Sequence, residues 1–325
     1  MSSDTKTTAP ATATRLATPT VFVDGAAGTT GLGIRERLAH QSDVAVKIID
    51  PDKRKDPAAK RALMEEVDLV ILCLPDEAAK ETVGLIDAMG AKGPKVLDAS
   101  TAYRVAPDWV YGFAELAPDQ ADMIRQARKV SNPGCYPTGA IALLRPLVDA
   151  GLIPADHPVT INAVSGYSGG GKSMIESYED GSAPAFELYG LNLHHKHLPE
   201  TQLYSHLARR PIFVPSVGNF RQGMLVSVPL HLDTLPGRPS GAALQDALAK
   251  RYAGSANVAV MPLDDVAIRN GRIEPEALNE TNRLELYVFA NDALGQAVLV
   301  ARLDNLGKGA SGAAVQNMRL MLGLE

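Results

Sequence analysis

Short apolar runs alternate with segments of helical periodicity over the first 100 residues of the chain. The apolar runs predict strands at 20–24, 44–50, 69–74 and 95–98. The segments between them predict helices at 32–38, 57–66 and 76–90. Strands and helices that alternate in this way are typical of a parallel, doubly wound α/β sheet with helices on both faces.

The pattern changes after residue 135. Strand-like runs are now joined by long loops, and one clear helix is predicted at 240–253. The runs lie at 158–164, 212–217, 224–232, 257–261 and 284–290. Such a pattern favours a mixed or antiparallel sheet, and therefore a second domain of the α+β class. From residue 305 the sequence predicts a Gly-rich loop followed by an amphipathic helix.

Composition narrows the class of protein. The 325 residues suffice for two domains, and 46% hydrophobic and 21% charged residues are typical of a globular protein. A net charge of −5 without a dense basic block argues against nucleic-acid and membrane-surface partners, and no apolar run is long enough for a membrane helix. Two cysteines fit a reducing cytoplasm better than a disulfide framework. The Thr/Ala/Ser-rich segment 1–18 predicts a disordered tail.

A glycine-rich turn follows the first predicted strand. Gly25, Gly28 and Gly31 have the spacing GxxGxxG, a variant of the GxGxxG turn of Rossmann-type dinucleotide-binding domains. Such glycines let the backbone approach a pyrophosphate at the N-terminus of the next helix. Asp50, at the end of the second predicted strand, is placed to bind the ribose of NAD, whereas the basic run 53–55 suits the 2′-phosphate of NADP. The residues alone leave this choice open.

A second glycine-rich loop, at 166–173, matches the P-loop pattern GxxxxGK[ST]. Taken alone, it indicates an ATPase or kinase with Lys172 on a phosphate. The loop opens the less regular half of the chain, however, and no convincing apolar strand downstream ends in an Asp that would hold magnesium. We therefore interpret it as a Gly/Ser loop that lines another site.

Cys135 has the strongest chemical signal in the chain. Pro133 and Gly134 predict a tight turn before it, and an apolar segment compatible with a helix follows. A thiol at such a helix start faces unpaired N–H groups and the positive end of the helix dipole, which favour the nucleophilic thiolate. The alternative is a small buried hydrophobic residue. That alternative is our prediction for Cys73, which lies in an apolar strand.

Three histidines, His194, His195 and His197, precede Glu200 within seven residues. The run contains no HExxH pattern and no Cys/His ligand set, so we predict an acid or base near the thiolate and no metal site. The sequence does not choose among the histidines. Arg104 follows the strand at 95–98, at the sheet edge where ligands bind, and suits a phosphate or carboxylate.

Six segments together resemble the N-acetyl-gamma-glutamyl-phosphate reductases of arginine biosynthesis, in their shorter form. They are DGAAGTTGLGIRERL at 24–38, DASTAYR at 98–104, SNPGCYPTGA at 131–140, SGYSGGGKS at 165–173, HHKHLPE at 194–200 and LGKGASGAAVQNM at 306–318. The resemblance spans nearly the whole chain apart from the tail. It also implies kinship with aspartate-semialdehyde and glyceraldehyde-3-phosphate dehydrogenases.

The resemblance implies a domain layout and a cofactor. Residues 19–136 and 304–325 would form a discontinuous dinucleotide-binding domain. Residues 137–303 would form the substrate-binding and oligomerisation domain of a homodimer or homotetramer. The family uses NADP(H), which favours a 2′-phosphate held by Lys53, Arg54 or nearby groups over the NAD that Asp50 would suit.

The resemblance also implies a reaction and its residues. Cys135 would attack the acyl phosphate of N-acetylglutamyl 5-phosphate, and hydride from NADPH would reduce the resulting thioester to N-acetylglutamate 5-semialdehyde. His197, with His195 next, would be the acid/base, oriented by Glu200. The implied substrate-binding residues are Arg104, Asn132, Ser165 and Lys172, with Arg104 ahead of Lys172 for the phosphate. The implied cofactor-binding residues are Gly25, Gly28, Thr29, Thr30, Gly31, Lys53, Arg54, Ser100, Gly309 and Ser311.

Three other functions compete with this one. A reductase of another acyl phosphate, such as aspartyl phosphate, would share the fold and differ in its preferred substrate. A P-loop phosphotransferase would bind magnesium-ATP and depend on Lys172. A non-catalytic NADP-binding regulator would have an ordinary thiol pKa at Cys135 and no turnover.

Overall fold

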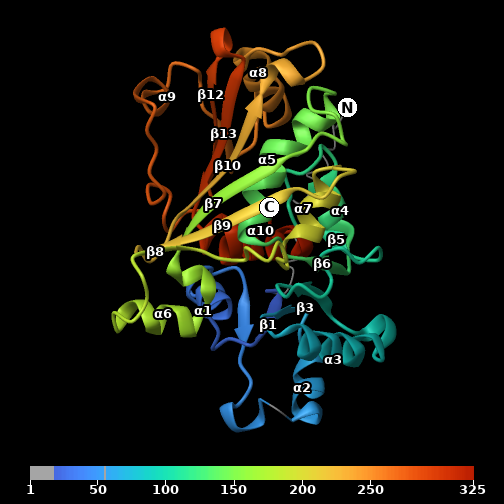
Figure 1. Cartoon of the computed structure of the whole chain (residues 1–325). Helices are drawn as coiled ribbons and strands as arrows, with labels where there is room; N and C mark the ends of the chain where they lie inside the picture. Colours follow the sequence, from blue (N-terminus) through green and yellow to red (C-terminus); the bar gives the residue numbers. More distant parts are fainter. Residues whose placement is uncertain (1–17, 55) are drawn as a thin grey trace, which may run out of the picture.

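The computed structural model describes residues 18–54 and 56–325, which form two β-sheets joined through helices (Figure 1). The first sheet, sheet A, is parallel with strand order β2-β1-β3-β4-β6-β5. Its strands are β1 (Thr20–Asp24), β2 (Ala45–Lys47), β3 (Leu69–Leu72), β4 (Lys95–Asp98), β5 (Val110–Tyr111) and β6 (Lys129–Ser131). The helices between them are α1 (Thr29–Leu38), α2 (Pro57–Met64), α3 (Asp76–Asp87) and α4 (Gln120–Gln126). The predicted parallel, doubly wound sheet is confirmed.

Helices cover both faces of sheet A because successive strand residues point to opposite sides. Val21 and Val23 of β1 pack with α1, α4 and α10 (Gly312–Leu322), the last helix of the chain. Phe22, between them, packs on the other face with α2 and α3. The C-terminal segment therefore returns to the N-terminal sheet, where Ala314 and Met318 are buried.

The second sheet, sheet B, is mixed and has the strand order β11-β12-β13-β10-β7-β9-β8. Its strands are β7 (Thr160–Gly166), β8 (Phe186–Leu188), β9 (Ile212–Gly218), β10 (Met224–His231), β11 (Val258–Val260), β12 (Leu284–Asn291) and β13 (Gln296–Leu303). The pairs β7–β9 and β11–β12 are parallel and the other pairs are antiparallel. The remaining α-helices are α5 (Cys135–Asp149), α6 (Lys172–Glu179), α7 (Leu198–Tyr204), α8 (Gly241–Arg251) and α9 (Val266–Asn270).

Helix α5 connects the two halves of the molecule. It starts directly after the turn that follows β6 of sheet A, and its apolar residues pack on sheet B. Gly139 allows the close approach, because a Cβ there would lie 2.9 Å from Cγ2 of Val226 on β10. The first turn of α5 is therefore held between the two sheets.

Two elements differ from the sequence-based expectation. The second strand, predicted at 44–50, contains only Ala45–Lys47, because Asp50 caps a short 3₁₀ turn over Pro51–Lys53. The first helix begins at Thr29 rather than 32, directly after the glycine-rich turn. The expected disordered tail lies outside the described residues except for Thr18. Within the described part of the chain, no helix is both long and apolar enough to cross a membrane.

Candidate active site

Two cavities lie on either side of the glycine-rich turn. The larger cavity, about 620 Å³, is lined by Gly25, Ala26 and Ala27 and by residues from the ends of β1 and β2. The second, about 310 Å³, is lined by the stretch 28–31 and by Cys135, and is called the cysteine cavity below. Leu74 lines both. A ligand as long as a dinucleotide can therefore lie across the turn from one cavity to the other.

The three glycines of this turn have different physical roles. Gly25 has a φ of +86°, and a Cβ there would collide with the carbonyl of Cys73. A Cβ at Gly31 would collide with the carbonyl of Gly25. Gly28 has open space instead, because a Cβ would meet only the Gly25 oxygen, at 3.7 Å. Since no side chain of the described residues caps α1 behind Gly28, the N–H groups of its first turn are free to bind an anion.

Four basic side chains line the larger cavity. Lys60 pairs with Asp24 and Lys47 with Glu66, each at 2.6 Å. Arg35 and Arg54 make no ion pair within the described residues, so they leave positive charge for a ligand. Three other residues were expected near the ribose or 2′-phosphate of a cofactor. The Asp50 carboxylate accepts a hydrogen bond from the Asp52 N–H, and Lys53 is exposed and does not line the cavity. Lys55 lies outside the described residues.

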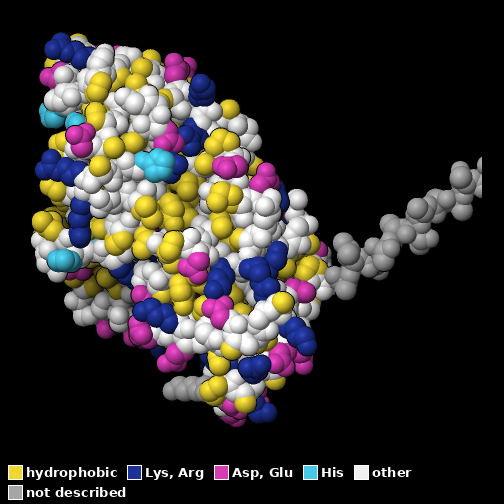
Figure 2. Space-filling view, turned by 90° about the vertical axis from the view of Figure 1, so that its right-hand side faces the viewer, with side chains coloured by type: hydrophobic (Ala, Val, Ile, Leu, Met, Phe, Trp, Pro, Cys, Tyr) yellow, Lys and Arg dark blue, Asp and Glu magenta, His cyan; other side chains and the backbone are white. Residues whose placement is uncertain are grey.

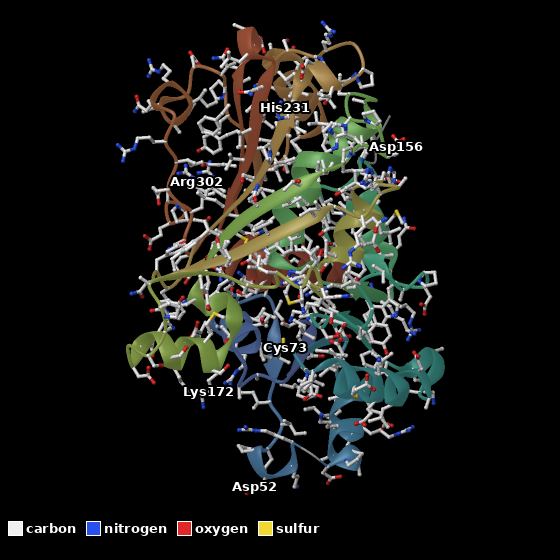
Figure 3. All side chains as sticks on the ribbon, viewed as in Figure 1. Asp52, Cys73, Asp156, Lys172, His231 and Arg302 are labelled. Carbon is white, nitrogen blue, oxygen red and sulfur yellow. The ribbon has the colours of Figure 1, made fainter. Side chains whose placement is uncertain are left out.

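Cys135 is the first residue of α5 and is half-buried in the cysteine cavity. Gly134 is the N-cap, and no side chain in the described part of the chain caps the helix. Gly309, from the turn Gly307–Ser311, packs against the cysteine, since a Cβ there would lie 2.8 Å from Cβ of Cys135. Cys73, which follows β3 (Figure 3), packs on the core of sheet A as expected and also lines this cavity.

The acidity of Cys135 departs from the sequence-based expectation. Burial raises the pKa of its thiol to about 11, and the carboxylate of Glu200 adds to this rise. The Tyr136 N–H and the charges of Arg104 and Lys196 lower the pKa, but burial outweighs them. The helix start therefore does not by itself produce a thiolate at neutral pH. A base is needed to ionise the thiol.

This high pKa predicts how Cys135 reacts with iodoacetamide in the ligand-free protein. Because only the thiolate reacts, the rate should rise about tenfold per pH unit between about pH 7 and about pH 10. Peptide mapping separates Cys135 from Cys73, whose pKa burial raises to about 12. A rate that levels off below about pH 8 would instead show an acidic thiol.

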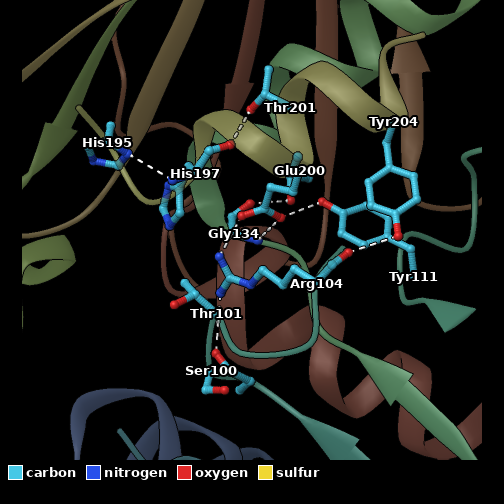
Figure 4. A network of polar contacts seen from close by, with 12 residues as sticks. Ser100, Thr101, Arg104, Tyr111, Gly134, His195, His197, Glu200, Thr201 and Tyr204 are labelled. Carbon is cyan, nitrogen blue, oxygen red and sulfur yellow. Dashed lines mark hydrogen bonds and ion pairs between the residues drawn. The ribbon is translucent and has the colours of Figure 1, made fainter. Parts of the chain in front are cut away.

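Glu200 lies at the centre of a buried polar network (Figure 4). Its Oε1 accepts a hydrogen bond from Arg104 Nη1 at 2.6 Å. Its Oε2 accepts from the Tyr111 hydroxyl at 2.7 Å and from the Gly134 N–H at 3.1 Å. We expected Glu200 to orient a histidine, but its hydrogen bonds within the described residues go to these three groups. It therefore holds the turn that carries Cys135.

His197 is the histidine that faces this turn. It is buried, lines the cysteine cavity, and its Nε2 would lie 2.8 Å from a Cβ on Gly134. Burial and the charge of Arg104 hold its pKa well below the ordinary value, so the imidazole is neutral and its protonation is disfavoured in the ligand-free protein. His195 does not line the cavity; its Nδ1 accepts the His197 backbone N–H at 3.2 Å. Burial lowers the pKa of His195 to about 4.

Removing the Glu200 carboxylate should destabilise the protein. Glu200→Ala leaves the buried Arg104 guanidinium without its counterion, so we expect the free energy of unfolding to fall by about 3–5 kcal/mol. Glu200→Gln keeps hydrogen-bond acceptance and should lose less. Urea unfolding at equilibrium measures both variants. A loss below about 1 kcal/mol in Glu200→Ala would mean that the pair behaves like an exposed one.

The other expected site residues divide into two groups. Asn132, the stretch 28–31 and Gly309 line the cysteine cavity, and Arg54 lines the larger one. Five expected residues line neither cavity: Lys53, Ser100, Ser165, Lys172 and Ser311. The serine hydroxyls are used within the fold, since those of Ser100, Ser165 and Ser311 donate to Asp98, to the Gly166 carbonyl and to the Leu306 carbonyl.

The loop that resembles a P-loop contributes to the cysteine cavity without its lysine. Ser168, Gly169 and Gly171 line the cavity. The Lys172 side chain lies on α6, 88% exposed, with Glu176 at 3.6 Å (Figure 3). The loop therefore lines the Cys135 site, as we interpreted it.

Three residues near the cavities escaped the sequence analysis. Lys196 lines the cysteine cavity and lies inside the histidine run, which was the available signal. Arg35 lines the larger cavity from α1. Tyr111 comes from the two-residue strand β5, and no motif marks it. No cluster of three or more His, Cys, Asp or Glu suited to a metal occurs in 18–54 and 56–325.

Comparison with known proteins agrees with this geometry. Residues 51–124 match the NAD binding domain of semialdehyde dehydrogenases, and residues 135–305 match their dimerisation domain. Aspartate semialdehyde dehydrogenase II from Vibrio cholerae has the same fold, with a TM-score of 0.69 at 16% identity over 94% of this chain and 98% of that chain. The Candida albicans aspartate semialdehyde dehydrogenase with NADP has a TM-score of 0.61 at 16% identity over 94% and 99%.

Relatives of high sequence identity specify the family. N-acetyl-gamma-glutamyl-phosphate reductase from Chelativorans sp. (strain BNC1) is 56% identical over 308 residues, covering 94% of this chain and 98% of the relative. The reductase of the same name from Brucella ovis is 54% identical over 310 residues, covering 94% and 99%. With Cys135, Arg104 and His197 gathered at one cavity beside a dinucleotide-binding turn, the chain belongs to the N-acetyl-gamma-glutamyl-phosphate reductase family.

Proposed function

We propose that this protein reduces N-acetylglutamyl 5-phosphate to N-acetylglutamate 5-semialdehyde and inorganic phosphate, a step of arginine biosynthesis. The observation that carries the proposal is the cysteine cavity, where Cys135 at an uncapped helix start shares one space with the glycine-rich turn, Arg104 and His197. The names of the relatives supply the substrate. The alternative of a P-loop phosphotransferase loses its support, because Lys172 is turned to solvent.

The first half of the reaction forms a thioester. The negative charge of the bound phosphoryl group favours the imidazolium form of His197. His197 then accepts the proton of the Cys135 thiol, and the sulfur attacks the acyl carbon of the substrate. The S–C bond forms, the C–O bond to the phosphoryl group breaks, and phosphate leaves with the electron pair and takes the proton from His197. Uncapped N–H groups at the start of α5 stabilise the negative charge that develops on the acyl oxygen.

The second half releases the aldehyde. NADPH, when bound, supplies the hydride that reduces the thioester carbon. The C–S bond then breaks, its electron pair returns to the sulfur, and the Cys135 thiolate takes a proton from water. Gly309 packs against the cysteine and leaves no side chain in this space, so the thioester has room.

The two cavities fit NADP(H). The open surface beside Gly28 and the uncapped N-terminus of α1 suit the pyrophosphate. Arg35 and Arg54, which have no ion-pair partner within the described residues, suit a 2′-phosphate in the larger cavity. Asp50, the residue that would favour NAD, is instead used to cap a turn. These observations support NADP over NAD.

Packing supports the proposed domains and assembly. We place the dinucleotide-binding domain at 19–136 and 304–325, because α10 packs on sheet A, and the substrate domain at 137–303.

The match to a dimerisation domain supports a homodimer or homotetramer. Hydrophobic side chains gather in the middle of the face in Figure 2, and exposed apolar residues recur between 186 and 212 in the second half. A free catalytic thiol suits the reducing cytoplasm.

An assay in the oxidative direction tests this function. With NADP and inorganic phosphate, the protein should oxidise N-acetylglutamate 5-semialdehyde with a higher kcat/KM than aspartate semialdehyde, which is the matched competitor. A preference for aspartate semialdehyde would instead indicate that aspartyl phosphate is the substrate in the reductive direction. Absence of turnover with both aldehydes would favour the non-catalytic regulator.

A further inference from the structure

Two cationic side chains line the cysteine cavity, and they differ in whether they have an ion-pair partner. Arg104 is nearly fully buried and pairs with Glu200 at 2.6 Å, so its charge is already compensated. Lys196 is the second cation, and within 18–54 and 56–325 it has no carboxylate at ion-pair distance. His197 is neutral and the Cys135 thiol is protonated. Among the described residues that line the cavity, Lys196 is therefore the cation without an ion-pair partner.

Lys196 and the reacting Cys135 line the same cavity. The residue lies between His195 and His197, directly before α7, and its positive charge opposes the burial that raises the pKa of Cys135. Burial would also raise the pKa of Asp76, in the first turn of α3, but hydrogen bonds from Thr101 and the charges of Lys196 and Arg104 bring it below its ordinary value. The Asp76 carboxylate therefore offsets part of the Lys196 charge, although the two side chains form no ion pair.

Arg104 cannot replace Lys196 as the source of net charge. Arg104 and Glu200 act on the thiol in opposite directions, because one lowers its pKa and the other raises it. The pair therefore contributes orientation and hydrogen-bond donors, while Lys196 contributes charge. An acyl phosphate brings a doubly charged phosphoryl group into the cavity, and such a group needs a cation that is not already paired.

We propose that Lys196 is the counterion of the phosphoryl group, in the substrate and in the phosphate that leaves. The phosphoryl oxygen is bonded to the carbon that Cys135 attacks, whereas the α-carboxylate of the substrate lies several bonds away. A cation that lines the cavity holding the sulfur is therefore placed for the phosphoryl group rather than for the carboxylate. This inference rests on the proposed function.

The chain offers a matched control. Lys172 is the lysine that the P-loop pattern favoured for phosphate. Both lysines are exposed, but only Lys196 lines the cysteine cavity. Lys196→Gln should raise the KM for inorganic phosphate in aldehyde oxidation at least about tenfold, the loss of one modest ionic contact. The KM values for aldehyde and NADP should stay within about twofold, and Lys172→Gln should leave all three KM values within about twofold. Lys196→Arg should restore part of the phosphate affinity.

Two outcomes would overturn the proposal. A raised KM for the aldehyde with an unchanged KM for phosphate would place Lys196 on the substrate carboxylate. Unchanged KM values in Lys196→Gln would show that Lys196 is a solvated lysine that does not bind the phosphoryl group. Protection of Cys135 from iodoacetamide by inorganic phosphate gives a readout without turnover, and we expect it in the wild type and in Lys172→Gln but not in Lys196→Gln. This protection keeps the test of Lys196 separate from failure of the proposed reaction.

Discussion

Cys135→Ser is expected to lower kcat for N-acetylglutamyl 5-phosphate reduction by about 10⁴-fold or more, because a serine hydroxyl is a far weaker nucleophile than a thiolate. The substitution changes one atom at the start of α5 and leaves the contacts of Gly134 with Glu200 in place. The thermal midpoint and NADP binding should therefore stay close to those of the wild type. Steady-state kinetics with NADPH measures the loss.

Cys73→Ser is the matched control for this variant. Cys73 also lines the cysteine cavity, but its place after β3 gives it no helix start and no role in the reaction. We expect kcat to stay within about threefold in this control. A Cys135→Ser enzyme that keeps a tenth or more of the wild-type kcat would contradict nucleophilic catalysis by Cys135.

Gly134→Ala is expected to give the second largest loss of activity. A Cβ at Gly134 would lie 2.6 Å from Arg104 Nη1, 2.8 Å from His197 Nε2 and 2.9 Å from Glu200 Oε1. All three groups must move, and a displacement of about 1 Å in a catalytic arrangement costs roughly 10²-fold in rate. We therefore expect kcat/KM to fall by about 10² or more.

Gly84→Ala serves as the control for this variant. Gly84 lies inside α3, and a Cβ there would meet no atom within 4 Å. Alanine should stabilise that helix by up to about 1 kcal/mol and leave activity unchanged. If Gly134→Ala kept full activity, the convergence of Arg104, His197 and Glu200 on this glycine would have no part in catalysis.

The fold could be predicted where local pattern decides the structure. The strands at 20–24 and 95–98 and the helix at 240–253 show clear periodicity, and the structure contains them as β1, β4 and α8. The two-residue strand β5 has too few residues for any period, so Tyr111 and its bond to Glu200 stayed hidden. Short elements are recognised through their partners, which lie far away in sequence.

The residues of the site could be predicted from the sequence better than the contacts between them. Cys135, Arg104 and His197 meet at one cavity because three separate segments end at the same place. The partner of Glu200, however, depends on how α7 packs against the turn before α5, and no local pattern encodes that packing. The direction of α6 likewise turns the Lys172 side chain away from the cysteine cavity, and a short glycine motif does not specify that direction.

The acidity of Cys135 shows the same limit in energetic terms. A helix start is visible in the sequence and lowers a thiol pKa. Burial is a property of the folded molecule, and here it raises the pKa to about 11. Burial also keeps the His197 imidazole neutral, and this effect is likewise invisible in the local sequence.

Trapping the acyl-enzyme tests the thioester account most directly. The full chain is incubated with N-acetylglutamyl 5-phosphate in the absence of NADPH, quenched in acid and digested for mass spectrometry. We predict an added N-acetylglutamyl group on the peptide that contains Cys135, removable by hydroxylamine and absent in Cys135→Ser. An enzyme that turns over but carries no adduct on Cys135, or carries it on another residue, would contradict the account.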